Sequence, residues 1–153
     1  DMIENTSVMA DEGISHTLGM VPLKTESAES DSRVMLVLDS GNTEVVKTVT
    51  TAELESKDQV VKPVSKQIPI AHLAPGQRIK LEAYARLGRG TEHAKWNSAN
   101  ISVLTNTDKD DEHILTVETT GSLEPKQIIL SGIEELSKRL EEFKEILVNL
   151  EEK

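Results

Sequence analysis

The chain has 153 residues, enough for roughly one domain with a hydrophobic core of its own. Its 27 acidic and 17 basic residues give a formal net charge of -10, and it contains one Trp, one Tyr and one Phe. Negative charge repels phosphate backbones, and so few aromatic side chains cannot stack along bases, so both features argue against direct nucleic-acid binding. The lack of cysteine excludes disulfides, thiolate catalysis and thiolate-bound metals.

The sequence shows no targeting or membrane-spanning pattern. Nothing resembles a secretory signal, and no run of about 18 apolar residues is present. We therefore expect a cytoplasmic protein. Residues 1–7 are typical of the end of a strand and begin abruptly, so we also expect the chain to be a piece of a longer protein.

The first regular element predicted along the chain is a short amphipathic helix over Asp11–Gly19. Acidic residues at its start complement the helix dipole, and glycine is a common residue at the end of a helix. Pro22 and Leu23 follow in extended conformation. The polar residues Thr25–Ser32 have the composition of a loop.

Two segments with the composition of β-strands follow. Residues 34–38 form an uninterrupted apolar run that ends at the turn signal 39–42, and residues 45–51 are rich in β-branched side chains. We predict that these two segments pair as a hairpin. Pro63 limits residues 60–64 to an edge strand at most.

An alternating strand and an irregular loop follow. Residues 77–86 alternate between apolar and polar side chains, which predicts a half-buried strand. Leu87–Trp96, here called the glycine loop, places two glycines around an arginine and ends at the only tryptophan. Neither strand nor helix periodicity explains this order, and such loops usually serve function rather than folding. We predict that the strand presents the glycine loop as a contact surface.

The last third of the chain is predicted as a connection, a strand and a long helix. Asn106–Glu112 is polar, His113–Thr119 alternates, and Pro125 suits the first turn of a helix because its missing N–H costs nothing there. The helix carries apolar residues at steps of four and three, the spacing of a coiled-coil seam. This helix seam consists of Ile129, Ile133, Leu136, Leu140, Phe143, Leu147 and Leu150. Burial of each side chain is worth roughly 1.5–3 kcal/mol, so we predict that a partner shares in covering it.

Two long motifs connect the chain to a known family. Asp11–Leu23 matches an acidic pair followed by His, Leu-Gly and Pro-Leu, and Gly88–Trp96 matches the pattern GRGxEHAKW. With these motifs the chain resembles the assembly-platform subunits of multisubunit RNA polymerases. This family includes the D protein of archaeal polymerases, the third-largest subunit of eukaryotic RNA polymerase II and the bacterial alpha amino-terminal domain. The residues that match the first motif are Asp11, Glu12, His16, Leu18, Gly19, Pro22 and Leu23.

The resemblance implies an α+β fold with the two-lobed scaffold of the alpha amino-terminal domain. A mixed β insert lobe would cover residues 6–105. A dimerisation lobe would combine residues 1–5 with residues 113–153 and end in the long helix. Because the family's preceding strand and helix are missing, we expect this second lobe to be incomplete.

The resemblance also implies a function and partners. It indicates a non-catalytic subunit that nucleates assembly of a DNA-directed RNA polymerase for transcription in an archaeon. The implied partners are subunit L, the second-largest subunit and the small subunits N and P. The helix seam would pair with subunit L. The chain's own sheet would cover the rest of the seam. The glycine loop would dock on the second-largest subunit through Arg89, Gly90, Glu92, His93, Lys95 and Trp96.

We predict no cofactor for this chain. Many archaeal members of the family carry cysteines for iron–sulfur clusters or zinc, and this chain has none. Its histidines are scattered over separate predicted elements, and its acidic run lacks the spacing of an EF-hand loop. The residues considered are His16, His72, His93 and His113, and Asp108, Asp110, Asp111 and Glu112.

Two alternatives stay open at this point. Asp11, Glu12 and His16 lie about one helical turn apart, so a stand-alone α/β-type enzyme could use them as an acid–base site. Such a site would also need a pocket, a nucleophile or a metal, and an orienting group. Alternatively, the chain could be an adaptor that associates with itself through the terminal helix alone.

Overall fold

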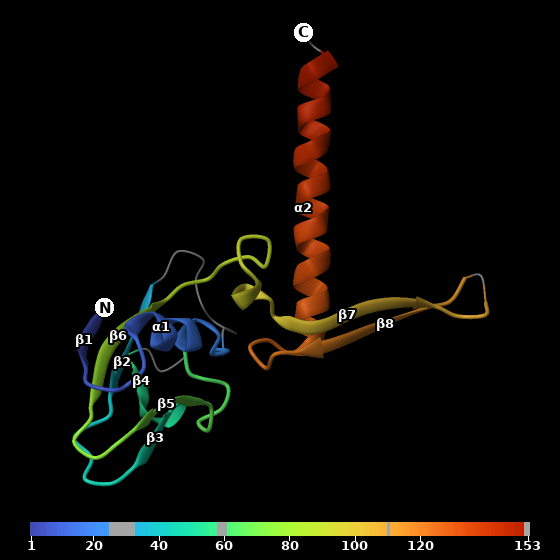
Figure 1. Cartoon of the computed structure of the whole chain (residues 1–153). Coiled ribbons are helices and arrows are strands. Elements are labelled where there is room, and N and C mark those ends of the chain that lie inside the picture. The colour runs from blue at the N-terminus through green and yellow to red at the C-terminus, as the bar shows by residue number, and fades with distance from the viewer. Residues whose placement is uncertain (25–32, 58–60, 110, 152–153) are drawn as a thin grey trace. The chain divides into compact units, whose positions relative to one another are not determined.

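The chain folds as two compact units, each with antiparallel strands and one α-helix. The computed structural model describes residues 1–24, 33–57, 61–109 and 111–151 (Figure 1). Unit 1 comprises Asp1–Asn97 with Thr120–Ser122, and unit 2 comprises Ser98–Thr119 with Leu123–Lys153. The predicted α+β class is confirmed.

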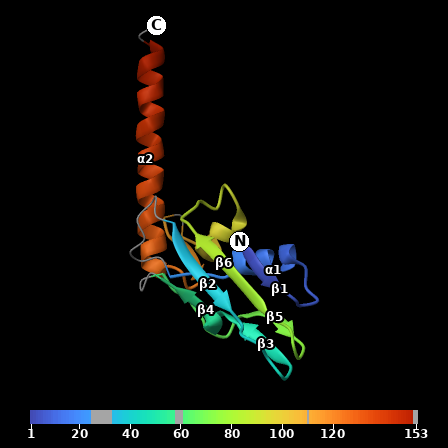
Figure 2. The same cartoon turned by 90° about the vertical axis from the view of Figure 1, so that its left-hand side faces the viewer.

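A four-stranded antiparallel sheet forms the centre of unit 1. Its strand order is β1 (Met2–Asn5), β6 (Ile79–Ala85), β2 (Val34–Asp39) and β4 (Leu54–Ser56). Figure 2 shows β2 and β6 side by side, in a register that pairs Leu38 with Leu81. The predicted alternating strand is confirmed as β6, whose Ile79 and Leu81 are buried.

A second, two-stranded sheet pairs β3 (Lys47–Thr50) with β5 (Pro69–Leu73). The hairpin predicted between residues 34–38 and 45–51 is therefore wrong. Seven residues separate β2 from β3, and the carbonyl of Thr43 in this connection accepts a hydrogen bond of 2.7 Å from Gly76 N, at the turn after β5. This bond holds the start of β3 against the β5 turn, so β3 pairs there.

Short elements complete the chain path around these sheets. The 3-10 turn η1 (Thr51–Glu53) follows β3 and is closed by a capping box between Thr50 and Glu53. The predicted edge pairing around Pro63 is present as a single bridge to Leu23. The polar stretch 25–32 lies outside the described residues.

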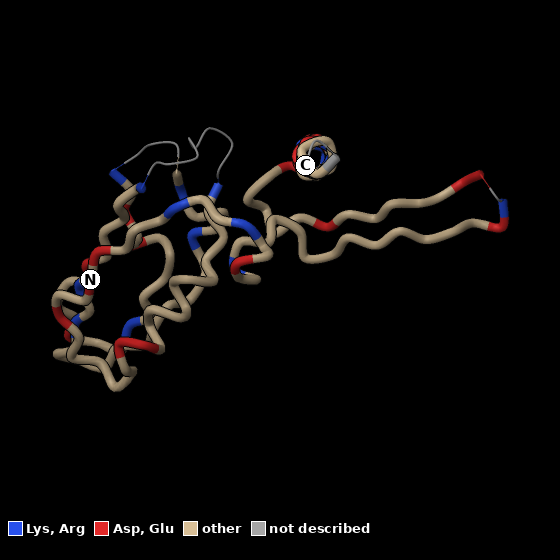
Figure 3. Tube along the Cα trace, turned by 90° about the horizontal axis from the view of Figure 1, so that it is seen from above, with Lys and Arg blue, Asp and Glu red and all other residues tan. Residues whose placement is uncertain are grey.

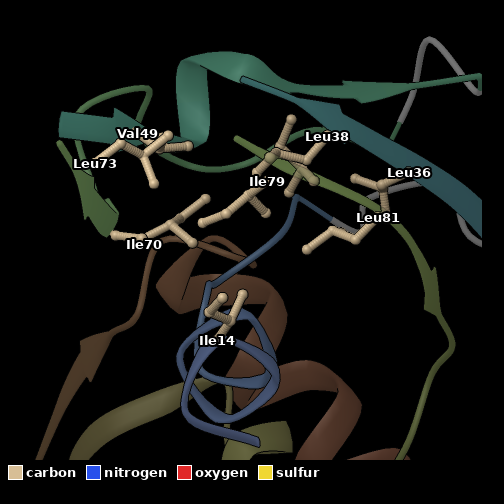
Figure 4. Packing of buried hydrophobic residues seen from close by; sticks show 10 residues of the cluster. Ile14, Leu36, Leu38, Val49, Ile70, Leu73, Ile79 and Leu81 are labelled. Atoms are coloured by element: carbon tan, nitrogen blue, oxygen red, sulfur yellow. The ribbon is translucent and has the colours of Figure 1, made fainter. Parts of the chain in front are cut away.

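Helix α1 (Asp11–Gly19) covers the sheets of unit 1 with the buried Ile14 and the partly buried Leu18. Ile14 has no solvent exposure and points toward the sheet residues that Figure 4 labels, including Ile70 and Ile79. The predicted helix bounds are confirmed. The buried cluster consists of Ile14, Leu36, Leu38, Val49, Leu54, Ile70, Ala71, Leu73, Ile79 and Leu81. Burial of each large side chain contributes roughly 1.5–3 kcal/mol to stability, so this core stabilises unit 1. It also holds β6, and with it the strand end from which the next loop leaves, in a fixed position.

An ion-pair network in unit 1 joins Arg78, the residue before β6, to Asp39 of β2 and Glu4 of β1. Arg78 Nη2 lies 2.7 Å from Asp39 Oδ2, and its Nε donates to Asp39 Oδ1 at 3.0 Å. Arg78 Nη1 also lies 3.4 Å from Glu4 Oε2. The hydrogen bond from Arg78, helped by the backbone N–H of Gly41, lowers the pKa of Asp39 from 3.8 to about 2.

Unit 2 is a long hairpin followed by a long helix. Strand β7 (Ala99–Asn106) pairs with β8 (His113–Thr119), and α2 spans Pro125–Glu151. The strand at 113–119 and the helix start at Pro125 are confirmed. Strand β7 has no counterpart among the predicted elements.

The hairpin carries apolar side chains on both faces. Cross-strand pairs put Val103 opposite Thr116 on one face and Leu104 opposite Leu115 on the other. Leu104 is 65% exposed and Val103 50%. In Figure 3 the charges of the hairpin gather at its tip, and the arms are almost without them. None of the described side chains of unit 2 is buried.

The contacts divide the chain at different places from the predicted lobes. Residues 1–5 were expected with the terminal helix, but β1 pairs with β6 in unit 1. The end of the expected insert lobe, residues 98–105, lies in unit 2 because β7 pairs with β8. Strand pairing, which joins residues far apart in sequence, sets both differences.

Candidate protein-interaction surfaces

The glycine loop leaves the end of β6 and folds back on itself. Its backbone makes a turn in which Glu92 N donates to the carbonyl of Arg89 at 2.9 Å. The short helix η2 (Ala94–Trp96) follows, with His93 at its start accepting a hydrogen bond through Nδ1 from Lys95 N at 3.0 Å. The loop therefore has ordered backbone bonds of its own.

Trp96, the last residue of this loop, has two cations of the same chain beside its ring. The guanidinium carbon of Arg86 is 4.3 Å from the ring centroid of Trp96, and Nζ of Lys95 is 4.6 Å from it. His93 meets the same ring edge-on, with centroids 6.5 Å apart. Positive charge over an indole face is attracted by the ring quadrupole. The half-buried tryptophan is thus the centre of the loop's own packing.

The two glycines allow close approach of the backbone to side chains. A Cβ on Gly88 would overlap Cδ2 and Cε2 of Trp96 and lie 2.7 Å from its Cε3. A Cβ on Gly90 would overlap Oδ1 of Asn97. Neither glycine has a positive φ. Both are needed for space, since the backbone passes directly against these side chains.

Glu92 holds both ends of the turn. Its Oε2 accepts from Arg86 Nη2 at 3.3 Å, and its Oε1 accepts from the backbone N–H of Arg89 at 3.2 Å. Arg86 is absent from the predicted site residues. The signal that could have found it is a cation at the end of an alternating strand, two positions before the first glycine.

The exposed part of the glycine loop carries excess positive charge. Arg89, Gly90, Glu92, His93 and Lys95 are all exposed. Among the ion pairs of the described residues none includes Lys95, so its ammonium group has only the Trp96 ring as a partner. A carboxylate from another molecule would find an unneutralised cation here.

The helix seam on α2 is open along its whole length. Its seven residues range from 37% exposed at Ile129 to 64% at Leu150. Three further apolar side chains beside the seam were missed by the four-and-three spacing. Leu130, Ile146 and Val148 are 50%, 57% and 48% exposed. Ion pairs on the flanks, such as Arg139 with Glu135 at 3.0 Å, leave this apolar surface uncovered.

The residues of the first motif support the structure around α1. Asp11 Oδ1 accepts from Asn5 Nδ2 at 2.7 Å, and the carbonyl of Pro22 accepts from Val64 N at 3.0 Å. Leu18 packs against the buried cluster and Gly19 is the last helical residue. Ala10, at the N-cap position of α1, makes no side-chain capping bond, and Asp11 and Glu12 lie in the first turn of the helix.

Asp11, Glu12 and His16 form no enclosed site. All three are exposed on α1. Within the described ranges, no group of three His, Asp or Glu side chains is arranged to hold a metal ion. Asp110 of the acidic run lies outside those ranges. The helices described here include none with the length and apolar character to cross a bilayer.

Comparison with known proteins identifies the family of the chain. The model of the RNA polymerase Rpb3/RpoA insert domain matches residues 3–107. This range includes the sheets of unit 1, helix α1 and the glycine loop. The chain therefore belongs to the RNA polymerase Rpb3/RpoA insert domain family.

Curated relatives share the printed name DNA-directed RNA polymerase subunit Rpo3. The protein from Thermococcus kodakarensis is 45% identical over 104 residues, which cover 63% of this chain and 39% of the relative. The one from Pyrobaculum islandicum is 43% identical over 114 residues, 64% of this chain and 42% of the relative. The one from Methanocaldococcus jannaschii is 34% identical over 149 residues, 97% of this chain and 74% of the relative. The chain spans about two fifths of the length of several relatives that it matches.

Proposed function

We propose that this chain is a non-catalytic assembly subunit of an archaeal DNA-directed RNA polymerase, or a part of one. One observation carries the proposal. The chain belongs to this polymerase family, and its unit 2 has no buried side chain among the described residues. Such a unit gains little stability from its own contacts and becomes stable when neighbours cover it. In this proposal unit 1 corresponds to the insert lobe and unit 2 to the dimerisation lobe.

Subunit L is the proposed partner of the helix seam. Seven residues at steps of four and three form one continuous apolar surface, which suits knobs-into-holes packing against another helix. Leu130 and Ile146 widen that surface on its flanks. A helix layer shared between two subunits buries more of this area than one helix buries on a two-stranded hairpin.

The second-largest polymerase subunit is the proposed partner of the glycine loop. Its contact groups are the exposed Arg89, Glu92 and Lys95, with Lys95 available to a carboxylate of the partner. The small subunits N and P complete the proposed set of neighbours. We place the protein in the cytoplasm and assign it no cofactor, in keeping with a sequence that has no cysteine.

A catalytic role for Asp11, Glu12 and His16 is not favoured. Their exposure on α1 leaves them without the excluded water and the third group that acid–base catalysis needs. The family of the chain and the names of its relatives favour assembly instead.

Co-expression with polymerase subunit L tests the proposal directly. We expect the purified chain and subunit L to form a one-to-one heterodimer by light scattering. Leu140→Asp puts an unpaired charge into the seam and should weaken pairing about 100-fold or more. Lys138→Asp, which places the same residue away from the seam, should pair as the wild type does.

Two results would contradict this assignment. If Leu140→Asp pairs as tightly as the wild type, the seam is not the contact surface. If the wild-type chain forms a homodimer and ignores subunit L, the self-associating adaptor is the better description.

A further inference from the structure

Trp96 is the only tryptophan of the chain, and its own neighbours surround it. Arg86 and Lys95 lie over the ring, and the backbone of Gly88 passes against it. A tryptophan that anchors a partner is usually presented to that partner as an open apolar surface. Here the ring already has neighbours from the strand end, the turn and η2, so its role differs from that of a contact residue.

Arg86 connects this packing to the rigid part of unit 1. It follows directly after Ala85, the last residue of β6, which pairs with Val34 of β2. From this fixed position its guanidinium reaches both Trp96 and Glu92, at 4.3 Å and 3.3 Å. A planar guanidinium can stack face-on against an aromatic ring while its edge N–H groups bind a carboxylate, a fixed geometry that the compact ammonium group of lysine does not have.

Glu92 connects Arg86 to the exposed turn. The carboxylate that binds Arg86 also accepts the backbone N–H of Arg89. Arg86 is thus linked through Trp96 to η2 and through Glu92 to the turn that carries the exposed side chains. One residue at the strand end restrains both halves of the loop.

We propose that Arg86 is a positioning residue, and that Trp96 is the internal pivot around which the glycine loop is held in its docking conformation before a partner binds. The proposal rests on the docking role given to this loop under the proposed function. A preformed loop loses less conformational entropy on binding, so its partner binds more tightly. Arg89 and Lys95 make the contacts, while Arg86, Gly88 and Trp96 keep them in place.

Fluorescence of the purified full chain tests whether Arg86 holds the loop around Trp96, because Trp96 is the only source of indole emission. Two cations beside the ring attract iodide and repel caesium, so iodide should quench the wild type more strongly. Arg86→Ala should lower the ratio of iodide to caesium quenching constants about twofold, since one of two nearby charges is lost. It should also move the emission to longer wavelength.

Two further variants separate bracing from general damage. Arg86→Lys keeps the charge without the planar guanidinium. Its ratio of quenching constants should equal that of the wild type, and its emission should lie between those of the wild type and Arg86→Ala. Arg139→Ala, which breaks an exposed arginine–glutamate pair on α2, should leave Trp96 unchanged. Far-UV circular dichroism should be the same for all variants.

Capture of the co-expressed second-largest polymerase subunit tests the consequence. The wild type should retain this subunit. Arg86→Ala should bind it about threefold or more weakly, because the variant loses one exposed cation–π contact and the loop conformation that this contact holds. Arg86→Lys should fall between the two.

Each outcome decides a different statement. Unchanged quenching and emission in Arg86→Ala would show that the residue does not brace the loop. Changed fluorescence with undiminished capture would show that bracing does not matter for docking. If the wild type itself fails to retain the second-largest subunit, the proposed function of the loop is contradicted, while the fluorescence still decides whether Arg86 holds it.

Discussion

The two units use the same kinds of side chain in opposite ways. Strand β6 in unit 1 alternates, so its apolar residues share one face and are covered by Ile14 of α1. Hairpin β7–β8 in unit 2 has apolar residues on both faces, and α2 adds a third apolar surface. Unit 1 therefore contains what is needed to bury its own core, whereas unit 2 consists of surfaces that require other elements to cover them.

The largest expected contrast between the units is in the cost of losing a leucine. Leu38→Ala removes a side chain with no exposure from the core of unit 1, and should lower the free energy of unfolding by about 2–5 kcal/mol. Leu140→Ala trims a side chain that is 59% exposed, and should change it by less than about 0.5 kcal/mol. Urea unfolding followed by Trp96 fluorescence and by circular dichroism measures both.

These two variants can break the comparison. If Leu140→Ala destabilises the isolated chain as much as Leu38→Ala does, α2 is covered within a single copy and unit 2 has a core. Subunit L binding provides the matching readout, because there Leu140→Ala should have the larger effect.

Glycine to alanine should have opposite signs in the two units. Gly121 of unit 1 has φ 92°, and a Cβ there would lie 2.6 Å from Cγ1 of Val64, so Gly121→Ala should destabilise the chain by about 1 kcal/mol or more. Gly132 lies within α2 with open space around it, so Gly132→Ala should favour the helix by roughly 0.5–1 kcal/mol. Thermal unfolding by circular dichroism distinguishes the signs, and equal signs would contradict the contrast.

The smallest expected effect concerns acid stability and belongs to unit 1 alone. The pKa of Asp39 is lowered in the folded state by its hydrogen bond to Arg78, so its contribution to stability is present above about pH 4. That contribution is lost as the pH falls toward about 2, where the folded carboxylate takes up a proton. Asp39→Asn should be less stable than the wild type at neutral pH. It should also lose less stability than the wild type as the pH falls from about 4 to about 2. Identical pH profiles for the two proteins would show that the ion pair does not stabilise the fold.

Sequence patterns predicted the elements that carry their own local signal. Helix α1 has acidic residues at its start and glycine at its end, β6 alternates, and α2 begins at Pro125. Strand partners were harder to predict because pairing joins distant residues. Strand β3 pairs with β5 across a connection that no local pattern marks. Strand β7 was missed because Leu104 interrupts its alternation, on the face that also carries Ser102 and Asn106.

The candidate surfaces were predicted unevenly for a similar reason. The helix seam depends on spacing alone, and the structure leaves those side chains open as that spacing suggests. The glycine loop was predicted to be a contact surface from its sequence. Arg86 was not among the predicted residues, because its contacts arise only when the chain folds back onto the strand end. The glycines serve close approach to Trp96 and Asn97, which sequence cannot distinguish from a need for unusual dihedral angles.

The β7–β8 hairpin has a consequence for how much of this protein a cell can hold. In the sheet described here β7 and β8 have no third strand beside them, and few charges interrupt their arms. Strand edges of this kind template further strands, and apolar faces beside them favour stacking of identical copies. We therefore expect copies whose hairpin stays uncovered to aggregate or be degraded, so the amount of chain that accumulates should depend on how much of this hairpin is covered.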